Sequence, residues 1–253
     1  MNAKFIAGMP RLGVKLSVAL LALALASIAP AAVYDVASDF SATLNPNGVW
    51  SYGSEDTLGG AFTLFDTPGS CCSGGEYWTN SSSYPIDIYN SSGSTINPAG
   101  TNPIPAGAAA FHPSNSGQYA IYRFTSPSLA TYDLNVTFTG YDNVGPTTTD
   151  VHVLLGVVPL FNGNITAYGA NPGGTASYAQ NGLLLAANDF IDFAVGWGSN
   201  QNYYYDTTGI AASLTSETDG NRVPEPATLG LLAIGLGVLI SARSRKKVAL
   251  RSR

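Results

Sequence analysis

The central part of the chain has almost no basic residues. From Val33 to Arg222 only Arg123 and Arg222 are basic, whereas 15 residues are Asp or Glu, so this segment has a formal charge of −13, compared with −5 for the whole chain. The field of so acidic a segment opposes binding to nucleic acid and to anionic lipid. It favours cations or neutral polar partners such as glycans.

The sequence also lacks the common catalytic motifs. It contains no G-x-S-x-G, H-E-x-x-H or P-loop pattern, and its only histidines are His112 and His152. His152 lies on an expected strand, where a structural role is the simpler interpretation, and His112 lies in an expected loop. Aspartates are numerous enough for a glycoside-hydrolysing pair, but the spatial separation that such a pair needs cannot be read from a sequence. We therefore expect that the protein is not an enzyme.

Cysteine is scarce, and the two cysteines, Cys71 and Cys72, are adjacent. In an oxidising compartment they could form a vicinal disulfide or pair between chains, and the alternative is a reduced pair without function. A vicinal bridge closes almost no loop, so it would add little chain-entropy stabilisation. Its effect would be local rigidity in the glycine-rich segment 69–75.

Helical periodicity is absent between Val33 and Arg222, and the apolar pattern is that of strands. Residues 131–139 alternate apolar and polar side chains, which predicts a half-buried strand. Similar patterns predict strands at 118–125, 149–157, 182–185, 190–195 and 210–215, with turns at 162–164 and 181–182. Short strands in a chain with 15 prolines and 28 glycines predict an all-β fold, an antiparallel jelly-roll β-sandwich.

This sandwich is expected to occupy residues 32–220 as one domain. Its best-defined strands lie in 118–215. Residues 33–117 are dominated by Ser, Thr, Gly, Asn and Pro, and we expect long loops and edge strands there rather than a second domain.

The N-terminus has the pattern of a secretory signal peptide. Lys4, Arg11 and Lys15 precede the apolar run 16–29, and small residues follow at 29–32. We expect a signal helix in residues 1–31 and cleavage near Ala31 by signal peptidase after engagement of the secretion machinery, with 24–26 as the competing cleavage site. The alternative is an uncleaved N-terminal anchor.

The C-terminal segment 221–253 has three parts. The tripeptide Pro224-Glu225-Pro226 comes first, followed by an apolar run at 227–242 and a basic tail at 243–253. A helix over the apolar run would be about 24 Å long at roughly 1.5 Å per residue, so it would span a hydrocarbon core of about 30 Å only thinly. The positive charges that would keep the tail in the cytoplasm are Arg243, Arg245, Lys246 and Lys247.

These three parts, VPEP, ATLGLLAIGLGVLISA and RSRKK, resemble the PEP-CTERM sorting signal of exported bacterial proteins. The resemblance implies export through the inner membrane, recognition of Pro224-Glu225-Pro226 by an exosortase, and cleavage nearby. It further implies a location at the cell surface or in the extracellular matrix, with a transmembrane helix that anchors the protein before processing. The alternative is an ordinary single-pass anchor that is never cut.

The segment from Gln118 to Ser213 resembles carbohydrate-binding or galactose-binding-like β-sandwich modules. The resemblance is carried by GQYAIYRFTSPSLATYDLNVTFTG, by TTTDVHVLLG with FNGN, and by LLLAANDFIDFAVGWGSNQNYYYDTTGI. It implies a jelly-roll fold, glycan binding by analogy, and the structural Ca²⁺ that such modules often hold. A sandwich of this kind hosts many unrelated functions.

An aromatic and amide-rich segment is the candidate glycan site. Sugar rings pack their C–H faces on Trp and Tyr while their hydroxyls bond to amides. In the alternative interpretation, alternate tyrosines point into the core and the tryptophan covers the edge of the sandwich. The candidate residues are Trp197, Asn200, Tyr203, Tyr204 and Tyr205, with Gln201 and Asn202 beside them.

Four aspartates near predicted strand ends are the candidate calcium site. Ca²⁺ binds six to eight oxygen atoms, many of them from carboxylates. No segment has EF-hand spacing, so the site would be assembled from distant parts of the chain. Turn and cap roles explain isolated aspartates equally well. The candidates are Asp150, Asp189, Asp192 and Asp206.

Two functions remain open from the sequence. One is an exported module that binds extracellular polysaccharide through the aromatic segment. The other is a structural or adhesive envelope or biofilm protein without a small-ligand site, which the Ser-, Thr-, Asn- and Gly-rich composition favours.

Overall fold

The structure is a computed structural model that describes residues 31–80, 84–145 and 147–217. These residues lie in the compact unit Pro30–Thr218, and the other unit, Met1–Ala29 with Asp219–Arg253, is outside them. The predicted signal helix, PEP tripeptide, C-terminal helix and basic tail therefore lie outside the described residues. Within the described ranges no helix is both long and apolar enough to cross a membrane.

Fourteen strands and no helix make up the described part of the chain. Their bounds are β1 Val33–Asp35, β2 Trp50–Glu55, β3 Phe62–Leu64, β4 Thr67–Cys71, β5 Gly75–Thr79, β6 Ile86–Asn90, β7 Ala109–His112, β8 Tyr119–Thr125, β9 Ala130–Gly140, β10 Asp150–Leu155, β11 Val158–Asn164, β12 Thr175–Leu185, β13 Phe190–Gly196 and β14 Thr208–Ser216.

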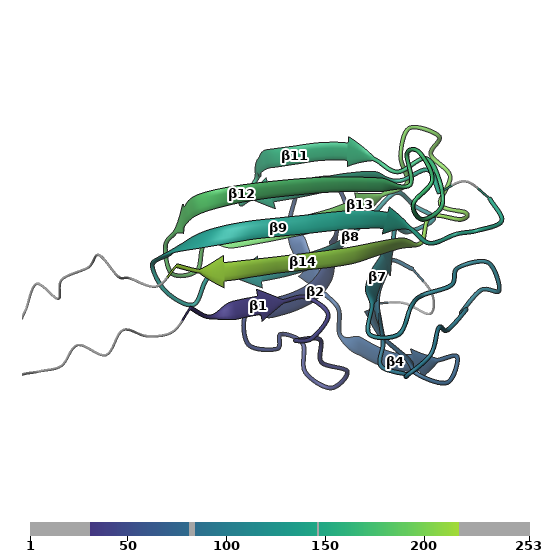
Figure 1. Ribbon diagram of the computed structural model, residues 1–253, viewed down its shortest axis with the longest axis horizontal. Helices are drawn as coiled ribbons and strands as arrows, with labels where there is room; N and C mark the ends of the chain where they lie inside the picture. Colours follow the sequence, from purple (N-terminus) through teal and green to yellow (C-terminus); the bar gives the residue numbers. More distant parts are fainter. Residues whose placement is uncertain (1–30, 81–83, 146, 218–253) are drawn as a thin grey trace, which may run out of the picture. The chain divides into compact units, whose positions relative to one another are not determined.

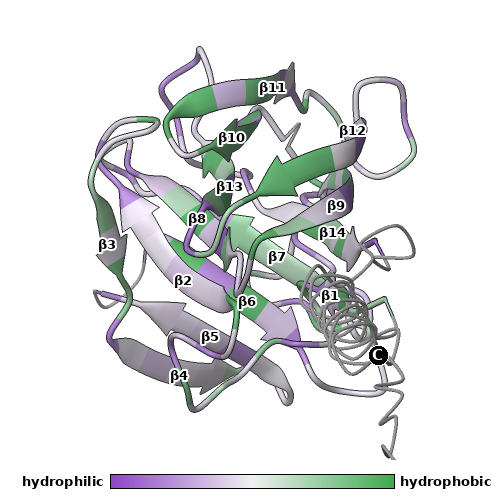
Figure 2. Cartoon of the chain, turned by 90° about the vertical axis from the view of Figure 1, so that its left-hand side faces the viewer, coloured by the Kyte–Doolittle hydropathy of each residue, from purple (hydrophilic) through white to green (hydrophobic). Residues whose placement is uncertain are grey.

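The strands form two antiparallel sheets that pack as a sandwich. The larger sheet has the order β12-β9-β14-β7-β6-β5-β4, with β1 also paired to β14, and the smaller has the order β11-β10-β13-β8-β2-β3 (Figures 1 and 2). All pairings are antiparallel. The predicted all-β class and antiparallel sandwich are therefore confirmed.

The core lies between the sheets and is rich in aromatic rings. The predicted alternation of β9 is confirmed, since Tyr132, Leu134, Val136 and Phe138 are all buried. Rings from opposite sheets meet edge to face, as Phe124 does with Tyr132 at a centroid distance of 5.6 Å. Such pairs stabilise a core beyond the area that they bury.

Several local predictions were wrong. Residues 162–164 end strand β11 instead of forming a turn, because the chain already reverses at residues 156–157, between β10 and β11. Asn181 and Gly182 form a bulge within β12, which begins at Thr175 and not at residue 182 as predicted. The register shift there lets one long strand continue where turn chemistry predicted a reversal.

The prediction of edge strands in 33–117 was also wrong for four strands. β2, β5, β6 and β7 each lie between two neighbours. The polar composition of residues 33–117 as a whole misled the prediction, because these strands are short and lie among polar connections. The strand β2 also buries Ser54 and Glu55.

The outward face of the larger sheet differs between its two halves. Over β12, β9 and β14 it carries small side chains beside an open groove of about 500 Å³, and we call it the polar half; its residues are Asn135, Thr137, Ser177, Ala179, Ala211 and Ser213. Over β4 to β7 the outward side chains are covered by residues 91–108, and we call it the covered half. Its small second core contains Ile88, Ile96, Ile104 and Ala110.

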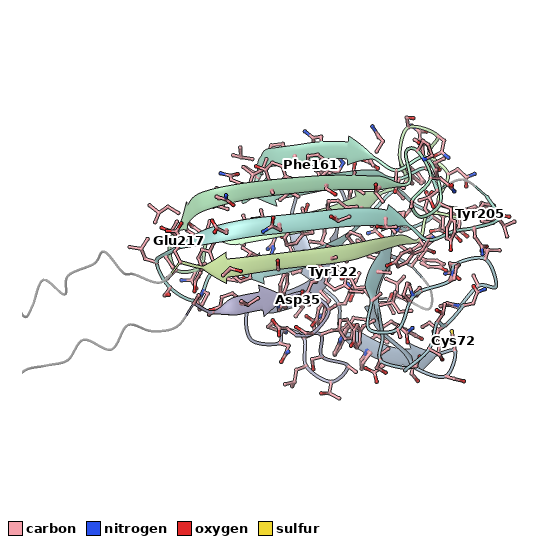
Figure 3. The ribbon with its side chains drawn as sticks, in the orientation of Figure 1. Asp35, Cys72, Tyr122, Phe161, Tyr205 and Glu217 are labelled. Atoms are coloured by element: carbon pink, nitrogen blue, oxygen red, sulfur yellow. The ribbon has the colours of Figure 1, made fainter. Side chains whose placement is uncertain are left out.

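The two ends of the sandwich carry different segments. The chain enters and leaves at one end, where the Ala32 amide donates to Ser216 Oγ at 2.9 Å and the Ser216 amide donates to the Ala32 carbonyl at 2.8 Å. The connecting residues 141–145, 147–149, 165–174 and 197–207 lie at the other end, which we call the loop end. Figure 3 shows Tyr205 at the loop end and Glu217 at the opposite end.

Candidate functional site

The loop end holds the predicted aromatic residues, and they differ in exposure. Tyr204 and Tyr205 are 62% and 43% exposed, whereas Trp197 and Tyr203 are half-buried. The Trp197 ring lies against Gly117 and the Tyr205 ring against Gly145, each so close that a Cβ on the glycine would overlap it. Two tyrosines are therefore presented to solvent, while Trp197 and Tyr203 are packed against neighbouring segments.

The amide side chains of this segment hold its shape. Asn200 Nδ2 donates to Thr148 Oγ1 at 2.7 Å, and Asn200 Oδ1 accepts the Asn202 amide at 3.1 Å. Asn202 Oδ1 in turn accepts the Tyr204 amide at 3.1 Å. These bonds fix the backbone beneath Tyr204, so the exposed ring stands on an ordered loop.

Two further rings, Tyr84 and His112, join the aromatic cluster and were missed from the sequence. Their centroids are 4.3 Å apart, and Tyr203 lies 5.8 Å from Tyr84 and 5.9 Å from His112. Tyr203 also contacts Tyr204, at 4.6 Å. Tyr84 precedes β6 and His112 ends β7. No sequence signal joins residues so far apart, because only the sheet order brings them together.

A pocket of about 240 Å³ opens beside this cluster, on the covered half. Its lining residues come from β4 to β7, from the residues just before β6 and β14, and from the β6–β7 connection: Cys71, Tyr77, Tyr84, Ile86, Ile88, Pro98, Asn102, Ile104, His112 and Thr207. Apolar walls with a few polar groups are typical of small-molecule sites.

The four candidate calcium ligands are divided between the two ends of the sandwich. Asp189 accepts the Ala186 amide at 2.8 Å in the turn between β12 and β13. Asp192 accepts Arg123 Nε at 2.6 Å and Nη2 at 2.7 Å. Asp150 and Asp206 lie at the loop end. Across residues 31–80, 84–145 and 147–217, no three His, Cys, Asp or Glu side chains are grouped so as to hold a metal ion.

Arg123 is enclosed by aromatic rings and acids on the outward face of the smaller sheet. Its guanidinium lies 4.0 Å from the Phe62 centroid and 3.9 Å from that of Phe190, and it also pairs with Glu55 at 3.3 Å. Burial and the neighbouring Asp192 raise the pKa of Glu55 to about 7, although the guanidinium acts against this rise. One cation thus serves two buried carboxyl groups, a structural role that occupies Asp192.

The acids at the loop end have opposite pKa shifts. Burial disfavours the charge of Asp150, but hydrogen bonds from His152, the Gly198 amide and Tyr119 outweigh burial and lower its pKa. Asp206 accepts the amide and hydroxyl of Thr148 through Oδ1, and its Oδ2 has no partner among the described residues. Burial raises the pKa of Asp206 to about 7.

Cys71 and Cys72 are both free thiols in the β4–β5 turn. Cys71 lines the pocket, while Cys72 is exposed and has a φ of 57°. Burial, together with a hydrogen bond to Cys72, raises the pKa of the Cys71 thiol to about 12. The vicinal disulfide stays a prediction.

Comparison with known proteins identifies the C-terminal segment. Residues 222–246 match the PEP-CTERM protein-sorting motif. The chain carries a PEP-CTERM sorting motif. This confirms the resemblance seen in VPEP and the segments after it, and it implies export, sorting and exosortase processing. No curated protein matches the chain.

Solved structures similar to the described part include three carbohydrate-binding modules. A family 35 module from Clostridium thermocellum is 10% identical, with a TM-score of 0.30, over 74% of this chain and 98% of that one. A family 35 module from an environmental isolate is 12% identical, with a TM-score of 0.28, over 67% and 93%. The CBM51 of a Clostridium perfringens GH95 protein, solved with methyl-galactose, is 16% identical, with a TM-score of 0.29, over 42% and 68%. These likenesses carry no argument about the site.

Proposed function

We propose that the protein is exported and sorted to the cell surface, processed next to Pro224-Glu225-Pro226, and binds a neutral polysaccharide through its loop end. The single observation that supports binding is the pair Tyr204 and Tyr205, exposed on a loop that hydrogen bonds keep ordered. Exposed tyrosines provide the apolar platforms on which sugar rings stack.

The placement of this loop supports display at a surface. Tyr205 and Glu217 lie at opposite ends of the sandwich (Figure 3). The sorting motif begins at residue 222, only a few residues after Glu217. The exposed tyrosines thus lie at the end of the sandwich opposite to the residue that leads into the sorting motif (Figure 3). Its acidic charge favours neutral over anionic polymers.

Affinity electrophoresis of the full chain in mild detergent, in gels containing neutral or acidic polysaccharide, tests this function. We expect retardation by a neutral polymer and about fivefold weaker binding for Tyr204→Ala, since one stacking contact contributes about 1 kcal/mol. Leu129→Ala is the matched control, because Leu129 is 50% exposed at the opposite end. Mobility unaffected by every polymer, or retardation that Tyr204→Ala leaves unchanged, would sink the proposal.

A second candidate is cohesion between envelope or matrix components without a small-ligand site. The polar half favours it, because it is a broad outward face of short Ser, Thr, Asn and Ala side chains beside an open groove. This function predicts that lysines at Thr137 and Ser177 weaken cell-to-cell cohesion in a sedimentation assay while leaving polysaccharide retardation intact. Cohesion equal to that of the unchanged chain would exclude it.

A further inference from the structure

The pocket of the covered half has a rigid apolar floor. Ile88 and Ile104 are 5% and 1% exposed, and Ile86 and Pro98 lie beside them in the lining. The segment above the sheet is anchored by Asn90, whose Nδ2 donates to the carbonyls of Ser94 and Ile104 at 2.9 Å each. A pocket built on such contacts exists before a ligand arrives, so binding costs little ordering of the protein.

One polar group in this pocket lacks a partner. His112 Nδ1 lies 2.8 Å from the Pro113 carbonyl, which can only accept, so Nδ1 carries the proton. Burial lowers the pKa of His112 to about 4, so the ring is neutral at physiological pH and Nε2 is an acceptor. No described residue donates to Nε2, although His112 is only 7% exposed. An acceptor left open in a nearly buried ring favours a ligand that donates a hydroxyl or amide hydrogen.

Two further polar residues of the lining, Asn102 and Thr207, are already hydrogen-bonded to each other. Asn102 Nδ2 donates to Thr207 Oγ1 at 3.1 Å, and Asn102 Oδ1 accepts the Ala99 amide at 2.8 Å. A fully hydroxylated sugar would therefore press hydroxyls against isoleucine, and each unpaired hydroxyl would cost about 1 to 3 kcal/mol. A methyl group in the same place would bury favourably.

The volume of the pocket and the charges near it further limit which ligands it can bind. About 240 Å³ is less than the roughly 300 to 1,000 Å³ of pockets for drug-sized ligands, so it suits a single ring. Burial and the neighbouring Tyr203 raise the pKa of Tyr84, and the carboxylate of Asp142 is near enough to add to this rise. The one cation among the described residues, Arg123, is held by Asp192 and Glu55. An anionic sugar would have no counter-charge here.

We propose that this pocket binds the terminal residue of a neutral glycan, a sugar that carries a methyl group as a 6-deoxy or an acetyl substituent. The methyl group lies on the isoleucine floor, a hydroxyl or amide donates to His112 Nε2, and the preceding sugars stack on Tyr204. Tyr203 connects the two parts because it contacts both Tyr84 and Tyr204. This inference rests on the proposed function and adds that the protein recognises the end of the polysaccharide chain.

Isothermal titration of the full chain in mild detergent tests this with the methyl glycosides of glucose, 6-deoxyglucose and N-acetylglucosamine. Glucose and 6-deoxyglucose differ by one hydroxyl, so the difference in their affinities measures the contact of a methyl group with the isoleucine floor. The third ligand distinguishes an acetyl from a deoxy sugar. We expect at least one of the methyl-bearing sugars to bind tenfold or more tightly than glucose. Equal affinity for all three, or no binding of any, overturns the inference.

Two variants locate the binding in the pocket. Ile86→Ser, at a half-buried position, should reduce the preference for the methyl-bearing sugar to less than threefold. His112→Phe keeps a ring beside Tyr84 and removes the acceptor, so it should weaken binding of all three sugars about tenfold. Circular dichroism melting shows whether each variant is folded, and Leu129→Ala is the surface control. A preference unchanged in a folded Ile86→Ser protein overturns the inference.

The outcomes separate this inference from the proposed function. Retardation by polysaccharide that depends on Tyr204, without binding of any of the three sugars, overturns the pocket alone. Binding of a methyl-bearing sugar in a chain that no polysaccharide retards overturns the proposed function, and with it the terminal position of the sugar. Enzymatic removal of the end residues of the polysaccharide should lower its affinity for the unchanged chain. The affinity for His112→Phe should not change, because that variant no longer binds the end residue in the pocket.

Discussion

The two halves of the larger sheet share a ladder of hydrogen bonds, and their outward faces have opposite character. Over β12, β9 and β14 most outward side chains are short and polar, as Thr137 and Ser177 show with a hydroxyl contact of 2.9 Å. Over β4 to β7 they are apolar or aromatic and lie under the segment 91–108. The same sheet thus provides a solvated surface on one side and a second small core with a pocket on the other.

The difference teaches where a binding cavity can form on a sandwich. The groove of the polar half is wide and open, so its groups bond to water and to neighbouring strands, and it excludes little solvent from a ligand. A covered face creates walls, and gaps between walls hold ligands. The loop end joins the two halves, because β14 pairs with β9 of the polar half and with β7 of the covered half.

Acid should affect the covered half through His112. Because its folded pKa is about 4 and an exposed histidine has a pKa near 6.5, the unfolded chain binds the proton more readily. Stability from this group is complete above pH 6.5 and falls as the pH drops towards 4, by about 3 kcal/mol in total. Urea denaturation at pH 7, 5.5 and 4 measures this loss. Between pH 7 and pH 4 the free energy of unfolding of the unchanged protein should fall by about 3 kcal/mol more than that of His112→Gln. Parallel pH curves for the two proteins would contradict this.

Removal of apolar volume should distinguish the two halves directly. Ile104→Ala should lower the free energy of unfolding by about 2 kcal/mol, because Ile104 is 1% exposed within the second core. Leu184→Ala is the matched control, since Leu184 is 59% exposed on β12. Its effect should stay within about 0.5 kcal/mol. Urea denaturation measures both, and equal losses would break the comparison.

The polar half should tolerate change best. The double variant Thr137→Ala with Ser177→Ala removes the hydroxyl contact between β9 and β12, which is exposed to solvent. Its free energy of unfolding should change by less than about 0.5 kcal/mol, because water replaces the lost hydrogen bond. Chemical denaturation measures the change. A loss above 1.5 kcal/mol would show that this face is a packed structural element.

The sequence predicted the fold well where periodicity was strong and poorly where composition was polar. The strand β9 was predicted to within a residue at each end, because burial of one face imposes alternation. The strands β2, β5, β6 and β7 were missed as interior strands, since they are four to six residues long and lie among polar connections that read as loops. The sequence predicted turns at 162–164 and 181–182, whereas the chain reverses at 156–157 and bulges at Asn181-Gly182, because turn residues also occur within strands and bulges.

The site shows the same division. The sequence identified Tyr204 and Tyr205 as candidates among asparagines but left open whether tyrosines of this segment point into the core, and the structure exposes both. Their partners Tyr84 and His112 could not be predicted, since they join the cluster only through the pairing of β6 with β7 and the return of the chain at β14. The four aspartates were grouped because each lies near the end of a predicted strand. In the antiparallel sheet, however, Asp150 and Asp206 lie at the loop end, and Asp189 and Asp192 lie towards the opposite end.

The sequence by itself determined the sorting motif at 222–246, the acidic charge and the all-β class, because linear motifs, charge and periodicity are local properties of a chain. The tertiary structure decided which residues form a pocket, which half of a sheet is covered and which acids have a counter-charge. Those properties depend on contacts between segments distant in sequence, and such contacts arise only when the sheets pair and pack.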